Sequence, residues 1–307
     1  MTNQKGNIKS PDEIPFRSGY IAIVGRSNVG KSTLLNSLLG EKVAIVSPRP
    51  QTTRNRITGI KTTAKAQIIF LDTPGIHQAQ SLMNRRMVDV ALQTLHEVDG
   101  VLWLLDAHER IGAQDERIAE LLRGVQTPVF IVLNKIDLVA KAKLLPLMQR
   151  CAELLPDKEI LPVSALKGDN LALLLELIER NLPEGPRYFP ADEVTDQSER
   201  FLAAEVVREK VFLLTREEIP YGVAVTIDEF TEKEEKNLIV IKATIHTERD
   251  SHKPILIGKQ GSMLKEIGMR TRAELEALLG CKIFLELFIR VDKGWTQRPH
   301  TLREMGL

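Results

Sequence analysis

The stretch GRSNVGKS, residues 25–32, has the residue types and spacing of a loop that binds a phosphate chain. It matches G-x-x-x-x-G-K-[ST], follows an apolar run and precedes a helical pattern. Gly25 and Gly30 permit the tight path that turns backbone N–H groups toward phosphate oxygens. Lys31 is expected to reach the β- and γ-phosphates, and the Ser32 hydroxyl to bind Mg²⁺. The predicted nucleotide-binding residues of this loop are Gly25, Arg26, Ser27, Asn28, Val29, Gly30, Lys31, Ser32 and Thr33.

A second motif, DTPG, ends the apolar run AQIIFLD. An acid at a strand end beside the phosphates is placed to hold the magnesium ion, which makes Asp72 a predicted metal ligand. The backbone N–H of Gly75 is expected to meet a γ-phosphate. The predicted nucleotide-binding residues here are Asp72, Thr73, Pro74 and Gly75.

NKID at 134–137 ends the apolar run PVFIVLN and predicts a guanine site. The Asp137 carboxylate can accept hydrogen bonds from N1–H and the 2-amino group of guanine, and adenine lacks both donors. Asn134 is expected to tie this loop to the phosphate loop. The backbone N–H of Ala165, in the later stretch SAL, is expected to meet the guanine O6. The predicted residues are Asn134, Lys135, Asp137, Ser164, Ala165 and Leu166.

A second glycine corner lies in PILIGKQGSML, residues 254–264, which indicates a strand end, a turn and the start of a helix. Gly258 and Gly261 lack side chains, so a nucleic-acid backbone can pack against the chain and against the helix start. Ile255 and Ile257 are candidates for an apolar floor under unstacked bases. The predicted RNA-binding residues are Ile257, Gly258, Lys259, Gln260, Gly261, Lys253, Lys265, Arg270 and Arg272.

These motifs need elements to position them, and the chain supplies two patterns. Between residues 19 and 181, nearly continuous apolar runs alternate with helical patterns, which predicts a mostly parallel sheet with helices on both faces. Prolines and acids then mark a linker. Beyond it, an amphipathic helix capped by Ser198, two alternating strands, the glycine corner, a helix and a last strand predict a smaller α+β domain. The predicted ranges are 1–17 (disordered tail), 18–182 (first domain), 183–197 (linker) and 198–307 (second domain with C-terminal tail).

Composition sets weaker limits. The chain has 307 residues and a net charge of +1, and residues 253–307 carry +4 against −3 for the rest. That small basic excess is a weak indication of polyanion binding. No run of 18 apolar residues occurs, so no membrane-spanning helix is predicted. The distant Cys151 and Cys281 favour a reducing compartment without a disulfide framework.

The order of the four nucleotide motifs resembles the translation-factor branch of P-loop GTPases, and GRSNVGKSTLLN, QTTR and DTPGIH resemble the Era family within it. The resemblance implies an α/β P-loop GTPase domain that binds GTP or GDP with Mg²⁺. It implies that Thr53, with Thr52 as the alternative, is a metal ligand in the GTP state. With Ser32 and Asp72, Thr53 completes the predicted metal site.

The resemblance also bears on catalysis. Ile76 follows DTPG where Ras-like enzymes carry a water-orienting glutamine, so the chemistry must come from positioning and bound cations. Asn28 stands where similar GTPases bind K⁺ beside the phosphates. The predicted catalytic residues are Lys31, Thr53, Gly75 and Asn28. Intrinsic turnover is expected to be slow, about 10⁻³ s⁻¹ by analogy with unassisted GTPases.

The second domain is similar to the C-terminal KH domain of the same family, which is of type II. The resemblance implies binding to the 3′ end of 16S rRNA, a role in maturation of the 30S ribosomal subunit, and a bacterial cytoplasmic location with peripheral association at the inner membrane. Two alternatives stay open: a P-loop phosphotransferase, and an RNA-binding module with a structural nucleotide that is not turned over. The linker and the arginines Arg49, Arg54 and Arg56 are candidate couplers between the domains or contacts with the ribosome. Trp295 is expected to pack the C-terminal tail rather than to stack on a base.

Overall fold

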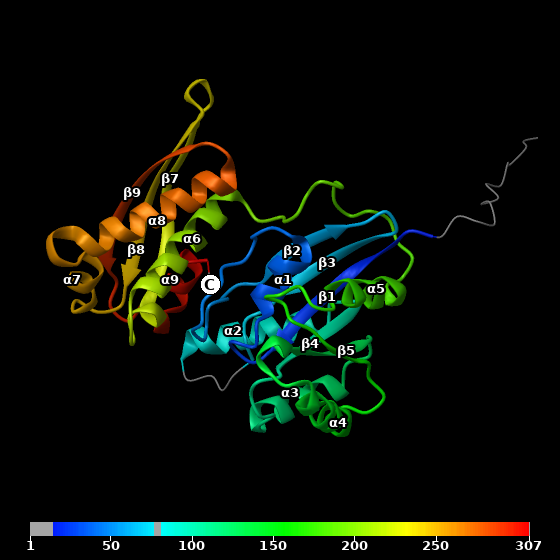
Figure 1. Cartoon of the computed structure of the whole chain (residues 1–307). Helices are drawn as coiled ribbons and strands as arrows, with labels where there is room; N and C mark the ends of the chain where they lie inside the picture. Colours follow the sequence, from blue (N-terminus) through cyan, green and yellow to red (C-terminus); the bar gives the residue numbers. More distant parts are fainter. Residues whose placement is uncertain (1–14, 77–80, 307) are drawn as a thin grey trace, which may run out of the picture.

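The computed structural model describes residues 15–76 and 81–306 and arranges them in two domains joined by an extended segment (Figure 1). The N-terminal domain contains a six-stranded sheet with the strand order β2-β3-β1-β4-β5-β6. Neighbouring strands pair in parallel except β2, which is antiparallel to β3. The strands are β1 (Arg17–Gly25), β2 (Ile57–Thr62), β3 (Ala66–Asp72), β4 (Gly100–Asp106), β5 (Val129–Asn134) and β6 (Ile160–Pro162).

Helices cover both faces of this sheet, as predicted from its nearly continuous apolar strands. On one face, α1 (Lys31–Leu39) and α5 (Leu171–Asn181) pack against Ile21 and Ile23 of β1. On the other, the neighbouring residues Ala22 and Val24 contact a core built with three helices. These three are α2 (Leu82–Thr94), α3 (Ala113–Arg123) and α4 (Leu144–Leu154). Because parallel strands end at one edge, the motifs that follow β1, β3 and β5 lie together there.

The edge strand β2 is absent from the predicted strands. Its sequence, ITGIKT, mixes apolar, polar and glycine residues instead of forming a continuous apolar run. Gly59 is needed for packing, since a Cβ at this position would lie 2.6 Å from Leu35 Cδ1 of α1. The strand is therefore set by its contacts with β3 and α1, which a local pattern does not reveal.

The C-terminal domain has a three-stranded sheet in the order β7-β8-β9, with β7 antiparallel and β9 parallel to β8. Its core lies between this sheet and the helices α6, α7 and α8. The chain has the element order α-β-β-α-α-β, which the resemblance to a type II KH domain implies, although the residue pattern itself predicted no helix before the glycine corner. The elements are α6 (Glu199–Leu214), β7 (Val223–Lys233), β8 (Leu238–Thr247), α7 (His252–Ile257), α8 (Ser262–Leu279), β9 (Lys282–Val291) and α9 (Pro299–Glu304). Short 3₁₀ turns lie at Ile136–Leu138, Lys141–Lys143, Pro220–Gly222, Glu234–Lys236, Lys259–Gly261 and Trp295–Gln297.

One local prediction was wrong. The run before the glycine corner was predicted as a strand end, but it forms α7, a helix of just over one turn that buries Leu256 and leaves Ile255 exposed. Pro254 is tolerated there because it lies in the first turn. The predicted disordered tail, 1–17, lies largely outside the described residues. Its last residue, Arg17, begins β1 and donates its N–H to Lys65 O at 3.0 Å.

The predicted linker runs along the edge of the N-terminal sheet. Gln67 of β3 accepts the backbone N–H groups of Tyr188 and Phe189 at 2.7 and 3.0 Å. Further along, Ile60 of β2 donates its N–H to Val194 O at 2.8 Å, and Thr195 Oγ1 donates to Thr58 O at 2.6 Å. The linker thereby covers the exposed edge of β2 before α6 begins.

The C-terminal tail packs between the domains, near the label C in Figure 1. Trp295 is fully buried with Met83 and Met87 of α2 and with Leu302 of α9, and its Nε1 donates to Gly222 O at 3.0 Å. The predicted packing role of Trp295 is therefore confirmed. None of the helices in the described parts of the chain combines the length and apolar character needed to span a bilayer.

Candidate functional site

The phosphate loop connects β1 to α1 and needs its glycines for two separate reasons. Gly25 and Gly30 have φ values of 152° and 98°, in the region that side chains disfavour. In addition, a Cβ on Gly25 would lie 2.5 Å from Leu104 O, and one on Gly30 would lie 2.3 Å from Asn134 Nδ2. The loop thus packs directly against the β4 strand and the NKID motif.

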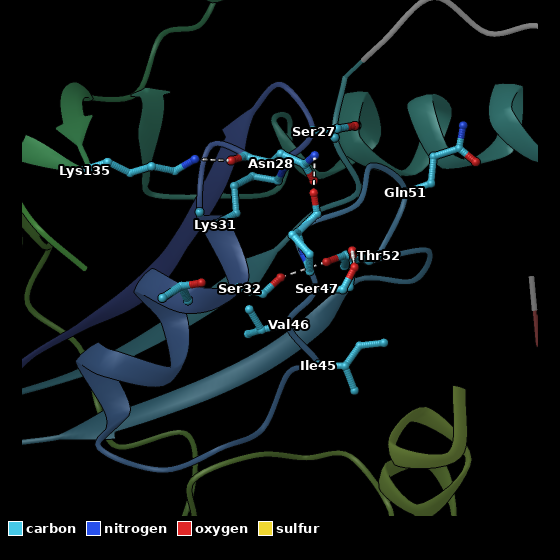
Figure 2. A pocket seen from close by; sticks show the side chains of 15 residues that line it. Ser27, Asn28, Lys31, Ser32, Ile45, Val46, Ser47, Gln51, Thr52 and Lys135 are labelled. Carbon is cyan, nitrogen blue, oxygen red and sulfur yellow. Dashed lines mark hydrogen bonds between the residues drawn. The ribbon is translucent and has the colours of Figure 1, made fainter. Parts of the chain in front are cut away.

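A cavity of about 430 Å³ opens beside this loop (Figure 2). The phosphate loop forms one wall and the segment between α1 and β2 forms another. We call residues 42–56 the switch segment. The lining residues are Ser27, Asn28, Gly30, Lys31, Ser32, Thr33, Ile45, Val46, Ser47, Pro48, Gln51, Thr52, Thr53, Gly75 and Lys135.

Lys31 brings a buried positive charge to the cavity. Its side chain is 6% exposed, and Nζ donates to Arg26 O at 2.9 Å and to Gly25 O at 3.4 Å. Burial lowers the pKa of Lys31 to about 8, and the charge of Asp72 opposes this shift. A buried ammonium held only by carbonyl groups is suited to an anionic ligand such as a phosphate.

Ser32, Thr53 and Asp72 form a corner of oxygen atoms at the base of the cavity. Ser32 Oγ lies 2.8 Å from Thr53 Oγ1 and donates to Asp72 Oδ2 at 2.6 Å, while Thr53 Oγ1 donates to the same oxygen at 3.3 Å. Burial raises the pKa of Asp72, against the opposing effects of Lys31 and the two hydroxyls. The other oxygen, Oδ1, is buried and has no hydrogen-bond partner among the described residues.

These donors fit the predicted magnesium ion. Hydroxyl and carboxylate oxygens are the ligands that Mg²⁺ takes, and the unpaired Oδ1 of Asp72 would gain a partner. Thr53, rather than Thr52, faces this corner. The Thr52 hydroxyl instead donates to Arg49 O at 2.8 Å and lies 3.0 Å from Ser47 Oγ (Figure 2).

The NKID loop is tied to the phosphate loop as its sequence predicts. Asn134 Nδ2 donates to Val29 O at 2.9 Å, and Asn134 Oδ1 accepts the N–H of Ala165 at 2.9 Å. Lys135 Nζ donates to Asn28 O at 2.7 Å and to Asp106 Oδ2 at 2.6 Å. Asp106, at the end of β4, was not among the predicted site residues, although it is an acid at a strand end.

Asp137 lies at the solvent-exposed end of this loop, where it is available to a base. Its Oδ1 accepts the Ser164 hydroxyl at 2.6 Å, which fixes the carboxylate beside the SAL stretch. Leu166 is 75% exposed and does not line the cavity. Arg26 also points elsewhere, since it pairs with Glu109 at 2.9 Å and Asp115 at 2.8 Å.

The DTPG turn lies against the phosphate loop. A Cβ on Gly75 would lie 2.6 Å from Ser27 Oγ and 2.7 Å from Ser27 N, so only glycine fits. Thr73 Oγ1 donates to Ile23 O at 2.8 Å. Ile76 is buried, and its N–H donates to Gly25 O at 3.1 Å. Because its side chain is apolar, it cannot orient a water molecule.

Asn28 lies within the phosphate loop and has a left-handed backbone, with φ 66°. Its Nδ2 donates to Pro48 O at 3.0 Å, joining the loop to the switch segment (Figure 2). The switch residues Ile45, Val46, Ser47, Pro48 and Gln51 were not predicted as site residues. Only their nearness to QTTR in the sequence signalled them.

The glycine corner begins α8 and borders a second cavity of about 460 Å³, between α8 and β9. Gly258 has φ 74° and ψ 173°, and Gly261 has φ 79° and ψ 10°. Of the predicted RNA-binding residues, Gly261, Lys265 and Arg272 line this cavity. The remaining lining residues, Leu264, Gly268, Met269, Leu285 and Leu287, were not predicted and provide its apolar surface.

The other predicted contacts lie around the cavity rather than in its lining. Lys259 and Gln260 are exposed at the corner itself, and Lys253 is exposed on α7. Arg270 pairs with Glu266 at 2.6 Å on the exposed side of α8. Ile257 is half-buried beneath the corner.

Comparisons with known proteins match each domain to a known family. Residues 20–135 match the family described as 50S ribosome-binding GTPase, and residues 218–296 match the KH domain family. GTPase Era from Geobacter metallireducens is 53% identical over 95% of this chain and 98% of its own. GTPase Era from Syntrophus aciditrophicus is 54% identical over 95% of this chain and 96% of its own.

Two solved structures share the arrangement of the whole chain. A crystal structure of an Era variant from Aquifex aeolicus bound to GDP·AlF4⁻ is 46% identical, with a TM-score of 0.92. A crystal structure of Era in complex with MgGDPNP and nucleotides 1506–1542 of 16S ribosomal RNA is 47% identical, with a TM-score of 0.91. Each match covers 95% of this chain and 99% of the other. With a GTPase site in one domain and a KH corner in the other, the chain belongs to the Era family of GTPases.

Proposed function

We propose that this chain is a GTP-hydrolysing switch that binds the 3′ end of 16S rRNA through its KH corner and acts in maturation of the 30S ribosomal subunit. The observation that carries this proposal is one chain with both sites: the oxygen corner of Ser32, Thr53 and Asp72, and the glycine corner at 258–261. In the oxygen corner, loss of a hydroxyl would remove a buried hydrogen bond, and in the glycine corner a side chain at Gly258 would meet Met263.

At the nucleotide site, each predicted residue has one task. The phosphate-loop N–H groups and Lys31 bind the phosphate chain, and Asp137 accepts two hydrogen bonds from guanine. When bound, Mg²⁺ neutralises charge on the β- and γ-phosphates. Ser32, Thr53 and Asp72 hold the cation through their oxygens. Because Thr53 belongs to the switch segment, loss of the γ-phosphate removes one reason for that segment to stay ordered.

Catalysis depends on positioning because Ile76 supplies no group to orient water. Asn28 stands beside the phosphates on a rigid left-handed turn, and we infer that it helps to hold K⁺ there. The carbonyl of Asn28 already accepts from Lys135, and its Nδ2 donates to Pro48 O, so the side-chain oxygen Oδ1 is the atom proposed to bind the cation. Slow hydrolysis by such a site suits a molecular switch that stays in its GTP-bound state for a long time.

The RNA proposal is supported by the relative that was solved with nucleotides 1506–1542 of 16S rRNA, which shares the whole-chain arrangement. In this chain, the cavity between α8 and β9 has apolar walls for bases and Lys265 and Arg272 for phosphates. The location at the cytoplasmic ribosome follows from this role. The predicted peripheral association with the inner membrane stays a prediction.

The test is binding of a single-stranded RNA that matches the 3′ end of 16S rRNA, measured with no nucleotide, GDP and a non-hydrolysable GTP analogue at fixed salt. The test variant is Gly261→Asp, which puts a negative charge at the corner. The matched control is Gly280→Asp at the other end of α8. Both glycines are left-handed, with φ 79° and 66°, and a Cβ at either meets nothing within 4 Å.

We expect the wild type and Gly280→Asp to bind the RNA more tightly with the analogue than with GDP, and Gly261→Asp to lose binding. Equal loss in both variants would show that general destabilisation explains the result. If the affinity for RNA is the same with every nucleotide, the GTPase and KH assignments both stand, but the proposed coupling between the two sites fails.

A further inference from the structure

The KH domain contacts both residues that flank Thr53, at the main-chain carbonyl of Thr52 and at the side chain of Arg54. Arg208 of α6 donates from Nη2 to Thr52 O at 2.6 Å. On the other side, Arg54 donates from Nη1 to Val223 O at 2.6 Å and from Nη2 to Tyr221 O at 3.0 Å and Pro220 O at 3.2 Å. The Thr53 hydroxyl between them lies 2.8 Å from Ser32 Oγ.

Both arginines lie deep in the domain interface. Each is 3% exposed, and their Cζ atoms lie 5.7 and 5.3 Å from the centre of the Phe212 ring. Arg54 is also 5.9 Å from the Trp295 ring. Glu205 pairs with Arg208 at 2.6 Å. Burial and the charge of Arg208 lower the pKa of Arg54 to about 9, so the guanidinium stays charged at neutral pH.

A buried guanidinium that leaves its carbonyl partners loses several charge-assisted hydrogen bonds at once. Arg54 is therefore expected to occupy this socket fully or to leave it, rather than to shift gradually. These carbonyl partners of Arg54 lie one residue along the chain from Thr53, whose hydroxyl lies 2.8 Å from Ser32 Oγ.

The next residue of α6, Glu209, holds the earlier part of the switch segment. Its carboxylate accepts the Val46 N–H at 2.9 Å and the Lys42 ammonium at 2.7 Å. Lys42 also pairs with Glu274 of α8, the helix that begins at the glycine corner, and Lys210 joins the same two carboxylates. The contacts of Arg208, Glu209 and Glu274, together with the main chain of the switch segment and of α6, therefore connect the oxygen corner to α8.

We propose that Arg208 is a positioning residue for GTP hydrolysis: by holding the Thr52 carbonyl, it sets the Thr53 hydroxyl at the magnesium corner, with Arg54 as the second anchor. This inference rests on the proposed GTPase function and deepens it. The KH domain then contributes to the active site, although none of its residues touches the nucleotide. Arg208 binds a main-chain carbonyl, so its role is geometric and not that of an arginine finger.

The test compares Arg208→Ala and Arg208→Lys with wild type, and Arg200→Ala is the matched control. Arg200 lies on the same helix and also donates to a backbone carbonyl, but that carbonyl belongs to Ile227 within the KH domain. Two quantities are measured: kcat and KM for GTP, and the Kd values of GDP and of a non-hydrolysable GTP analogue. The ratio of these Kd values reports the γ-phosphate-dependent contact independently of turnover.

We expect Arg208→Ala to lower kcat about tenfold and to weaken analogue binding about tenfold while leaving GDP affinity unchanged, as for the loss of one charge-assisted hydrogen bond. Arg208→Lys keeps a donor and should recover part of both effects. Arg200→Ala should match wild type. If Arg208→Ala fails to fold, Arg208→Lys carries the same comparison with a smaller effect.

An Arg208→Ala protein with wild-type kcat and a wild-type ratio of Kd values would overturn the inference while the GTPase function stands. Equal losses in Arg200→Ala would also overturn it, because they would trace the effect to general weakening of the KH domain. If wild type itself neither binds nor hydrolyses GTP, the proposed function fails and not this step alone.

Discussion

The glycine corner allows a prediction that separates two glycines three positions apart. Gly261 has a left-handed backbone in open space, whereas Gly258 has φ 74° and ψ 173°, a combination that is almost exclusive to glycine. A Cβ on Gly258 would also lie 2.6 Å from the backbone N and 2.7 Å from the Cβ of Met263. Only Gly258 therefore carries both strain and a clash with the main chain of α8.

The expected costs follow from these geometries. For Gly261→Ala, left-handed strain of about 1–2 kcal/mol is partly offset by about 0.4–1 kcal/mol of lost unfolded-state entropy, which leaves roughly 1 kcal/mol. For Gly258→Ala, conformational strain of about 1–3 kcal/mol and the displacement of Met263, about 1–3 kcal/mol, outweigh the same entropy gain and leave roughly 3 kcal/mol. The difference between the variants should therefore reach about 2 kcal/mol.

The assay is guanidinium unfolding in a Trp103→Phe background, so that emission comes from Trp295 in the KH domain. RNA binding is measured on the same proteins, and Gly261→Ala is expected to weaken it more than its small stability loss explains. Equal unfolding costs for the two variants, or a Gly258→Ala cost within about 0.5 kcal/mol of zero, would refute the reasoning. The same asymmetry makes Gly261 a better position than Gly258 for the test variant of RNA binding, because a side chain there meets no neighbouring atom.

Three further predictions use other parts of the molecule. Asn28→Ala should lower GTP turnover in K⁺ and bring the K⁺/Na⁺ rate ratio close to one, measured by phosphate release at equal ionic strength; an unchanged ratio would remove Asn28 from the cation site. Burial opposes the charge of Glu209, but hydrogen bonds from Lys210 and Lys42 hold its pKa below the ordinary value of 4.5. The ionised Glu209 therefore stabilises the folded protein above pH 4.5, and this stabilisation is lost as the pH falls through the lower pKa of the folded state. The unfolding free energies of wild type and Glu209→Gln should therefore differ at pH 7 and converge in acid. Burial raises the pKa of Cys151 to about 12, so iodoacetamide should label the half-buried Cys281 first and Cys151 only on unfolding, as followed by mass spectrometry; early labelling of Cys151 would contradict its burial.

The nucleotide site was predictable because each motif is local and ends a buried strand. The sequence placed Gly25, Asp72 and Asn134 at three strand ends, and a parallel sheet necessarily brings such ends to one edge. The approach of Thr53 to Ser32 at 2.8 Å followed only from family resemblance. The segment that carries Thr53 has no regular structure of its own.

The rest depended on contacts between distant parts of the chain. The segment of α7 was predicted as a strand end because its run PILI is apolar and contains β-branched residues. In the structure this segment is not part of the sheet, which has the order β7-β8-β9. β2 depends on packing against α1. In α6, the charged run Arg208-Glu209-Lys210 lies among apolar residues, and all three are buried. That run was a usable signal, since a helix that buries consecutive charges must meet partners on more than one side.

The linker explains why one hydrogen bond between domains can matter. Val194 and Thr195 are bound to Ile60 and Thr58 of β2, the strand into which the switch segment runs, and α6 begins at Glu199. The helix that carries Arg208 is thus anchored beside the segment that it holds. A long flexible linker would let the KH domain move away from the switch segment. Forming the contact between Arg208 and Thr52 would then cost the entropy of bringing the two domains together again. The bonds between the linker and β2 remove most of that cost, so the contact of Arg208 with Thr52 can position Thr53. The switch segment is thus connected to α6 in two ways, through β2 and the linker and through Arg208.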